Sequence, residues 1–275
     1  MRFIGVDLAW SRRNTSGIFA LECGGEVTSP LQQVAWSASI GSDEQILSFI
    51  QKNRGKEGCL IAIDAPLVVP NIQGTRPVDV EVTKRFRSQE AGTLPANRNI
   101  LKNQEGDVRG ETLVEKLEKT GCEHSFKIGK LDKGFKVFEV FPHPAMVIIF
   151  DLLTTLKYKA KKGRTLNFRL KEIERYKDYL SLLQEFIPPL AQPPPSRIRG
   201  LKSYEDLLDA LFCAWLSAYF WYWGPQGFEV VGDMQKGYII LPKSINHRAC
   251  RIKLKFKSQK YKHEYHKLDE WAQIV

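Results

Sequence analysis

Residues 2–8 read Arg-Phe-Ile-Gly-Val-Asp-Leu, and residues 59–64 read Cys-Leu-Ile-Ala-Ile-Asp. Both are short, continuous apolar runs, a pattern typical of strands that are covered on both faces of a sheet. Asp7 lies at the end of the first run and Asp64 at the end of the second. A carboxylate at the end of a buried strand costs free energy unless it is paired or binds a metal ion. The two segments therefore predict the centre of an α/β sheet and a polar site at the ends of its strands.

The segments around these runs predict further strands and helices. Residues 17–23 and 34–37 have strand patterns, and with residues 2–8 they predict an antiparallel meander. Later strands are expected at residues 135–141, 230–231 and 238–241. Helices are expected at residues 43–53, 78–90, 109–119, 168–186 and 204–223. This order predicts an α/β fold with a sheet of mixed direction, flanking helices and a helical insertion at about residues 70–130.

The chain is predicted to be organised as one domain with a basic extension. We expect the domain to span residues 1–245 and the extension to span residues 246–275. Residues 188–195 hold five prolines and predict a stiff connector within the domain. Between Arg248 and Lys267, basic residues outnumber acidic ones eight to one, so much of the formal net charge of +10 lies there.

Composition excludes several classes of protein. Hydrophobic residues make up 43% of the 275 positions, which is ample for a core and excludes a disordered chain. The longest nearly apolar run, residues 211–223, is shorter than the roughly 20 residues of a membrane span. No signal-peptide pattern is visible, so we expect a cytoplasmic protein with no membrane partner. The 5 cysteines form no Cys-x-x-Cys pair, and no P-loop or Gly-x-Gly-x-x-Gly motif occurs.

Three further acidic residues extend the pattern begun by Asp7 and Asp64. Glu139 lies in an expected strand, and Asp206 and Asp209 share one face of the helix expected at residues 204–223. Carboxylates that meet from separate elements repel one another unless cations neutralise them, and hard oxygen ligands select Mg²⁺ or Mn²⁺. Two such ions can hold the attacking and leaving oxygens of a phosphodiester. The alternative is that each acid caps a turn or a helix end.

Several of these segments carry a family resemblance. They are Gly5–Trp10, Ile61–Leu67, Glu139–Ala145, Asp206–Ala214 and Gly237–Pro242. Together they resemble an uncharacterised family of predicted RNase H-like nucleases, over about residues 1–242. The Asp-x-x-Asp-Ala motif at Asp206 is also similar to that of Holliday-junction resolvases.

The resemblance implies an RNase H-like fold and a role for each acid. Asp7, Asp64 and Asp209 would bind the metal ions together with Asp206, and Glu139 would act as a fourth catalytic group. The sequence departs from the resolvase pattern in one place, because it carries Asp rather than Glu at position 64.

Basic residues in two regions predict contacts to nucleic acid. The first set follows Asp64 in a segment that could form a lid, where arginine can bind phosphate bidentately, and comprises Arg85, Arg87, Arg98 and Arg109. The second set lies in the basic extension and comprises Arg251, Lys253, Lys255 and Lys257. Binding through such residues would be sequence-independent and sensitive to salt. The alternatives are a solvated helix face for the first set and a lysine-protected edge strand for the second.

The sequence therefore predicts a nuclease that depends on Mg²⁺ or Mn²⁺ and cleaves phosphodiester bonds of nucleic acid. Two alternatives stay open. One is a phosphotransferase or phosphohydrolase of small molecules with the same fold, which saturable ATP binding would favour. The other is a non-catalytic nucleic-acid-binding module, which would lose binding when the residues after Pro242 are deleted.

Overall fold

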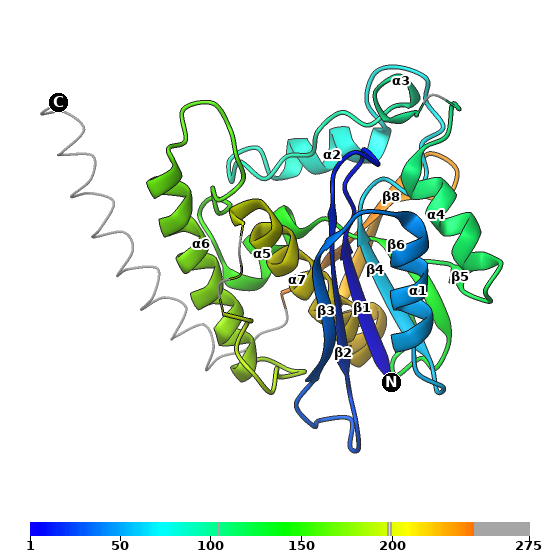
Figure 1. Ribbon diagram of the computed structural model, residues 1–275, viewed down its shortest axis with the longest axis vertical. Helices are drawn as coiled ribbons and strands as arrows, with labels where there is room; N and C mark the ends of the chain where they lie inside the picture. Colours follow the sequence, from blue (N-terminus) through cyan, green and yellow to red (C-terminus); the bar gives the residue numbers. More distant parts are fainter. Residues whose placement is uncertain (104, 197, 199, 245–275) are drawn as a thin grey trace, which may run out of the picture.

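The computed structural model describes residues 1–103, 105–196, 198 and 200–244. Its centre is a six-stranded sheet in the order β3-β2-β1-β4-β6-β5 (Figure 1). The first three strands of the chain form an antiparallel meander, whereas β4, β6 and β5 run parallel to β1. The strands are β1 (Arg2–Asp7), β2 (Ser16–Glu22), β3 (Gln32–Ile40), β4 (Cys59–Asp64), β5 (Glu123–His124) and β6 (Phe135–Glu139). The mixed sheet confirms the predicted fold class, which is consistent with an RNase H-like fold.

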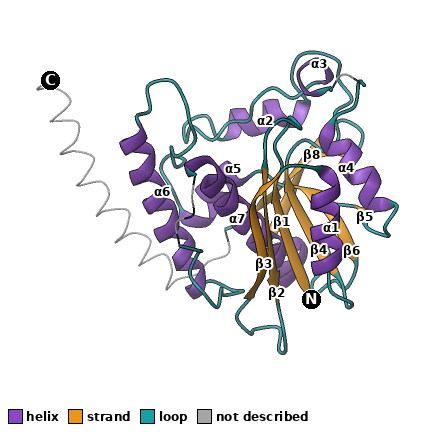
Figure 2. Ribbon diagram, in the orientation of Figure 1, coloured by secondary structure: helices purple, strands orange, loops and turns teal. Residues whose placement is uncertain are grey.

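Helices flank the sheet, and a separate hairpin follows the last long helix (Figure 2). The helices are α1 (Asp43–Asn53), α2 (Pro77–Arg85), α3 (Arg98–Leu101), α4 (Arg109–Glu118), α5 (Pro142–Phe150), α6 (Leu166–Ser181) and α7 (Leu201–Trp223). Short 3₁₀ turns span Leu182–Glu185 and Gly224–Gln226. The hairpin pairs β7 (Phe228–Asp233) with β8 (Gly237–Pro242) in a two-stranded sheet of its own.

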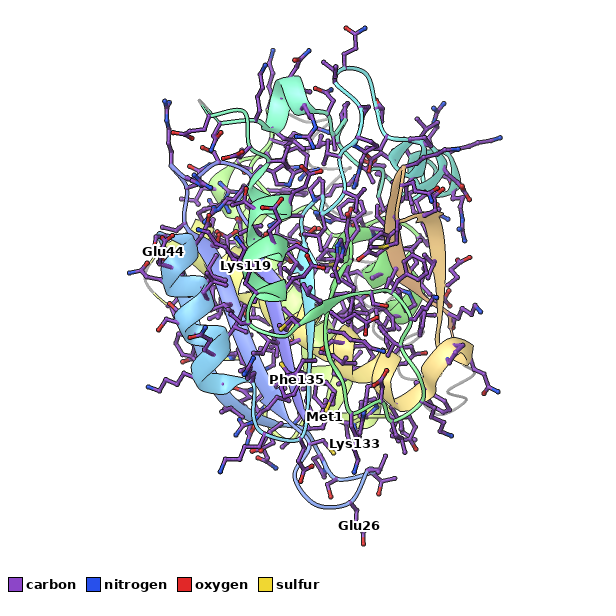
Figure 3. The ribbon with its side chains drawn as sticks, turned by 90° about the vertical axis from the view of Figure 1, so that its right-hand side faces the viewer. Met1, Glu26, Glu44, Lys119, Lys133 and Phe135 are labelled. Atoms are coloured by element: carbon purple, nitrogen blue, oxygen red, sulfur yellow. The ribbon has the colours of Figure 1, made fainter. Side chains whose placement is uncertain are left out.

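Alternating side chains of the strands divide the core into two layers. On β1, Phe3 belongs to the layer beneath α5, α6 and α7, whereas Ile4 and Val6 belong to the layer beneath α1 and α4. Figure 3 looks onto the second layer, with α1 (Glu44) and α4 (Lys119) lying next to each other across the sheet. Both faces of the central strands are thus buried, which explains their continuous apolar runs.

Two strand glycines allow α7 to lie unusually close to the sheet. A Cβ added at Gly5 would lie 2.0 Å from the carbonyl oxygen of Ala210, and one added at Gly17 would lie 2.2 Å from that of Asp206. No larger side chain fits at either position without moving the helix. Because α7 is nearly all buried, its apolar sequence is explained by packing. In the described part of the chain, no helix is long and apolar enough to cross a membrane.

The predicted element boundaries are close to the observed ones, with a few informative differences. The helix predicted at residues 43–53 is confirmed, and a capping box between Ser42 and Gln45 begins it. The helix predicted at residues 78–90 ends at Arg85, because the chain turns at Phe86 and reaches a left-handed conformation at Glu90. The basic extension at residues 246–275 lies outside the described residues.

Candidate functional site

The first two predicted acids lie side by side at the ends of parallel strands. Asp7 on β1 and Asp64 on β4 are direct register partners. Side chains along a strand alternate between the two faces of the sheet, so Asp7 lies on the same face as Phe3, and Asp64 on the same face as Leu60. Phe3 and Leu60 belong to the layer beneath α7, and both aspartates therefore lie on that face. The parallel pairing of β1 with β4 therefore brings together two carboxylates that are distant in sequence.

The long helix α7 supplies the other two aspartates. Asp206 and Asp209 lie in its first turns, and each is 1% exposed. The close approach of α7 at Gly5 and Gly17 holds these turns against β1 and β2. The hydroxyl of Tyr158 donates a hydrogen bond to Oδ1 of Asp209 at 2.6 Å, and Lys202 forms an ion pair with Asp206. Both side chains are thus held in place from more than one element.

A lysine ammonium lies at the centre of these carboxylates. Nζ of Lys159 is 3.1 Å from Oδ2 of Asp7 and 3.8 Å from Oδ1 of Asp206, and it forms an ion pair with Oδ2 of Asp209. Lys159 belongs to the segment between α5 and α6, so the contact draws a third part of the chain onto the site. The structure therefore brings Asp7, Asp206 and Asp209 together around one internal cation.

The carboxylates of the site outnumber the lysines that pair with them, and three of its ionisable groups have shifted pKa values. Burial raises the pKa of Asp64 well above its usual range, and the charge of Asp7 raises it further. Burial and Asp7 likewise raise the pKa of Asp206, to about 7. Burial alone would lower the pKa of Lys159, but Asp209, Asp7 and Asp206 raise it well above the usual value. Lys159 is therefore charged, whereas the raised pKa values of Asp64 and Asp206 favour their neutral, protonated forms.

Two carboxylates keep oxygen atoms without a hydrogen-bond partner. Oδ2 of Asp206 is buried and accepts no hydrogen bond within the residues that the structure describes. Across the same residues, the side chain of Asp64 makes no hydrogen bond or ion pair. A buried carboxylate in this state is costly, so a further cation or donor would stabilise the site.

Two of these aspartates, Asp7 and Asp64, line a cavity of about 540 Å³. Asp7 and Asp64 contribute to its surface together with basic and aromatic side chains, namely Trp10, Arg76, Phe141, His143, Lys159, Lys161 and Arg164. The volume lies within the range of small-molecule sites. Burial lowers the pKa of His143 to about 3, with a further contribution from Lys159, so its imidazole is neutral at ordinary pH.

Glu139 lies in the same cavity but has a different set of contacts. Its carboxylate pairs bidentately with Arg76, at 2.7 Å and 3.0 Å, and accepts a hydrogen bond from the backbone N–H of Leu67. Arg76 also pairs with Asp79. In strand register Glu139 is the partner of Ile63, so its side chain leaves the sheet on the face opposite to that of Asp64. Glu139 therefore makes no direct contact with the aspartates and anchors Arg76, although its charge contributes to the raised pKa of Asp64.

Of the predicted basic residues, the four arginines that the structure describes differ in their surroundings. Arg85 forms an ion pair with Glu229, and Arg98 pairs with Glu111 at 2.7 Å. Arg87 is exposed. Arg109 is 4% exposed and pairs with Asp43. The other four predicted contacts, Arg251, Lys253, Lys255 and Lys257, lie outside the described residues.

The donor set suits a hard divalent cation in its chemistry. Asp7, Asp64, Asp206 and Asp209 offer carboxylate oxygens, and the buried Oδ2 atom of Asp206 accepts no hydrogen bond within the described residues. Lys159 now holds the position between them. In the described residues, no three acidic, histidine or cysteine side chains form a metal-ligand arrangement. A bound ion would have to displace the ammonium.

Sequence reasoning missed Lys159 and Arg76. Lys159 lies in a basic run, residues 157–164, which reads Lys-Tyr-Lys-Ala-Lys-Lys-Gly-Arg and is the signal that could have drawn attention to it. Arg76 lies between Asp64 and the arginines of the predicted lid, but nothing in the sequence pairs it with an acid 63 residues away. Both contacts depend on where loops cross the sheet.

Comparisons with known proteins give one match. The family model described as "Protein of unknown function (DUF429)" matches residues 5–226. The match covers β1 through α7, and with them every aspartate of the site. No curated protein and no solved structure matches the chain at a significant level.

Proposed function

Because the chain belongs to the family of proteins of unknown function DUF429, its activity must be inferred from its site, and we propose that it is a metal-dependent hydrolase of phosphodiester bonds in nucleic acid. One observation carries the proposal. Carboxylates from β1 and α7 surround a single ammonium, and Asp64 from β4 lies beside Asp7 in the wall of the same cavity. Proteins keep such costly charge groupings mainly where function requires them.

The charge balance supports a bound cation. Four aspartates face two lysines, Lys159 and Lys202, so the group has a formal charge of −4 + 2 = −2 when all are ionised. Burial is the largest cause of the raised pKa values of Asp64 and Asp206, and the negative charge of Asp7 adds to it. Mg²⁺ or Mn²⁺ would neutralise the negative charge of the group, and both ions prefer carboxylate oxygens.

Asp7, Asp64 and Asp209 would hold the metal ion, with Asp206 beside them. When bound, such an ion lowers the pKa of water and stabilises negative charge on phosphate oxygens. Lys159, Lys161 and Arg164 line the same cavity and provide positive charge to orient a substrate phosphate. Lys159, which pairs with the aspartates in this structure, would contact that phosphate if a metal ion neutralised them.

His143 is not the proton acceptor in this proposal. Its ring lies in the cavity, but a pKa of about 3 makes it a weak base at neutral pH. Its Nδ1 atom lies 3.1 Å from the hydroxyl oxygen of Thr155, and its ring stacks on Tyr158. These contacts support the loop that carries Lys159.

The test is a cleavage assay with labelled single-stranded DNA, duplex DNA, RNA and a branched junction, each with Mg²⁺, Mn²⁺ or EDTA. We expect cleavage only with a divalent ion, and a loss of about 100-fold or more in Asp64→Asn, because the lost contact stabilises transition-state charge. Asp151→Asn, an exposed aspartate outside the cavity, is the matched control.

Asp64 is the sharpest choice for this test because its side chain makes no hydrogen bond or ion pair with any residue that the structure describes. Asp64→Asn should fold at least as well as the wild type, so a lost activity cannot be ascribed to unfolding. Mn²⁺ binding measured by calorimetry provides a second readout and should weaken in the same variant. Equal cleavage by Asp64→Asn and the wild type would contradict the proposal, and turnover of ATP alone would favour the small-molecule alternative.

A further inference from the structure

A second cavity of about 600 Å³ adjoins the acid-lined one. Trp10 lines both cavities, so its indole forms part of the boundary between them. The other lining residues are mostly polar or basic and include Arg12, Arg13, Asn99, Lys102, Asn103 and Arg109. The cavity lies where the β1–β2 loop meets the segment between α3 and α4.

Two buried donors in the wall of this cavity have no partner. Arg109 is 4% exposed, and its guanidinium is held by Asp43 through Nε and by the carbonyl oxygens of Ala9 and Ser11 through Nη1. Its remaining nitrogen, Nη2, makes no hydrogen bond within the described residues, and neither does Nδ2 of Asn103. Unpaired buried donors are costly, so an acceptor that enters this cavity and reaches these two nitrogens would be stabilised.

The surroundings of these donors favour an anion. Helix α4 begins at Arg109, and no side chain caps its first turn, so its free N–H groups add partial positive charge. Arg12, Arg13 and Lys102 are exposed at the cavity. Glu105 and Asp107 also line it, and Asp43 forms ion pairs with Arg109 and Arg12, so four basic residues face three acidic ones, or 4 − 3 = +1. This charge has the opposite sign to that of the aspartate group in the neighbouring cavity.

We propose that the second cavity binds a backbone phosphate of a single-stranded nucleic acid, and that the neighbouring nucleotide enters the acid-lined cavity. The inference rests on the proposed nuclease function and names its substrate class. Cavities of this size admit individual nucleotides and not a double helix. Trp10, half-buried between the two cavities, provides a face on which an unpaired base stacks.

Binding of a fluorescein-labelled oligothymidylate about a dozen nucleotides long tests the inference. Fluorescence anisotropy is measured on the full chain in EDTA, so that no strand is cleaved and the basic extension is present in every variant. The test variant is Arg13→Gln with Lys102→Gln, because neither side chain forms an ion pair in the described residues. Lys52→Gln with Lys56→Gln removes the same charge from exposed positions at the opposite end of the sheet.

We expect the Arg13/Lys102 variant to bind about 10-fold more weakly. The slope of log K against log salt concentration should become less steep by about 1.4, the value for two lost phosphate contacts to a single strand. The Lys52/Lys56 control should bind nearly as the wild type does. Trp10→Ala should also weaken binding, because base stacking contributes to it. An oligonucleotide that does not bind, or that binds equally to the test and control variants, would overturn the inference.

The two proposals fail separately. If cleavage is lost in Asp64→Asn but binding is unchanged in the Arg13/Lys102 variant, the nuclease proposal stands. The proposed phosphate site in the second cavity is then overturned. Weakened binding in the Arg13/Lys102 variant, with no metal-dependent cleavage of any substrate by the wild type, supports the second cavity as a strand-binding site and overturns the nuclease proposal.

Discussion

Nζ of Lys159 lies 3.1 Å from Oδ2 of Asp7, although 152 residues separate them along the chain. The same ammonium forms ion pairs with Asp206 and Asp209. The segment between α5 and α6 thus places a positive charge among the negatively charged side chains of β1 and α7. The ammonium of Lys159 thus supplies positive charge at the place where a metal ion would bind the aspartates.

Replacing this ammonium should make the protein depend on metal ions. Lys159→Met leaves the aspartates without their central cation, and we expect a loss of about 1–3 kcal/mol, reduced from the value for a fully buried pair because Lys159 is partly exposed. Mn²⁺ should raise the melting temperature of this variant more than that of the wild type. Differential scanning fluorimetry with and without MnCl₂ measures both effects, with Lys157→Met, whose ion pair with Glu90 is at the surface, as the control. Equal Mn²⁺ shifts in the variant and the wild type would refute the expectation.

Asp206 should make the folded state less stable as the pH rises. Its pKa in the folded protein is raised to about 7, above the value of about 4 in an unfolded chain. Between pH 4 and pH 7 the folded state therefore holds the proton more tightly, and the free energy of unfolding contributed by this group falls as pH rises. Asp206→Asn should remove that fall. Urea denaturation at pH 4.5, 6 and 7.5 compares the two proteins, and parallel pH profiles would rule out the assignment.

The packing of α7 on β1 should tolerate no side chain at Gly5. In Gly5→Ala the new Cβ would lie 2.0 Å from the carbonyl oxygen of Ala210, and backbone atoms cannot rotate away. We expect a loss of about 3 kcal/mol or more in the free energy of unfolding, at the upper end of overpacking effects. Gly24→Ala, whose Cβ would meet nothing within 4 Å, is the matched control and should be nearly neutral. Similar urea midpoints for the two variants would show that α7 does not lie so close.

The buried Arg76 should be required for stability. Arg76→Met would leave the carboxylates of Glu139 and Asp79 buried without their partner, at a cost of about 3–5 kcal/mol. The loss should be smaller at low pH, because burial already raises the pKa of Glu139 and its neutral form needs no cation. Arg85→Met breaks an exposed pair with Glu229 and should cost about 1 kcal/mol or less. Thermal unfolding at two pH values decides between these expectations, and an Arg76→Met variant as stable as Arg85→Met would contradict them.

The position of Glu139 shows where sequence reasoning reached its limit. The strand was correctly predicted, and its register with β4 places Glu139 opposite Ile63 rather than Asp64. A shift of one residue along a strand turns a side chain to the other face of the sheet. Because register depends on neighbouring strands, the sequence of β6 alone does not show which face Glu139 takes.

The sequence by itself determined the mixed α/β class and most strands and helices, because continuous apolar runs and 3.6-residue periods are local properties of the chain. It also identified the aspartates that end β1 and β4 and begin α7. It did not predict β5, α3 or the buried helix α5. Only the tertiary structure decided that Lys159 lies among them, that Arg76 engages Glu139, and that Trp10 lies between two cavities. These contacts join segments far apart in the chain, and their geometry follows from strand pairing and from the close packing of α7 on two glycines, which no local pattern encodes.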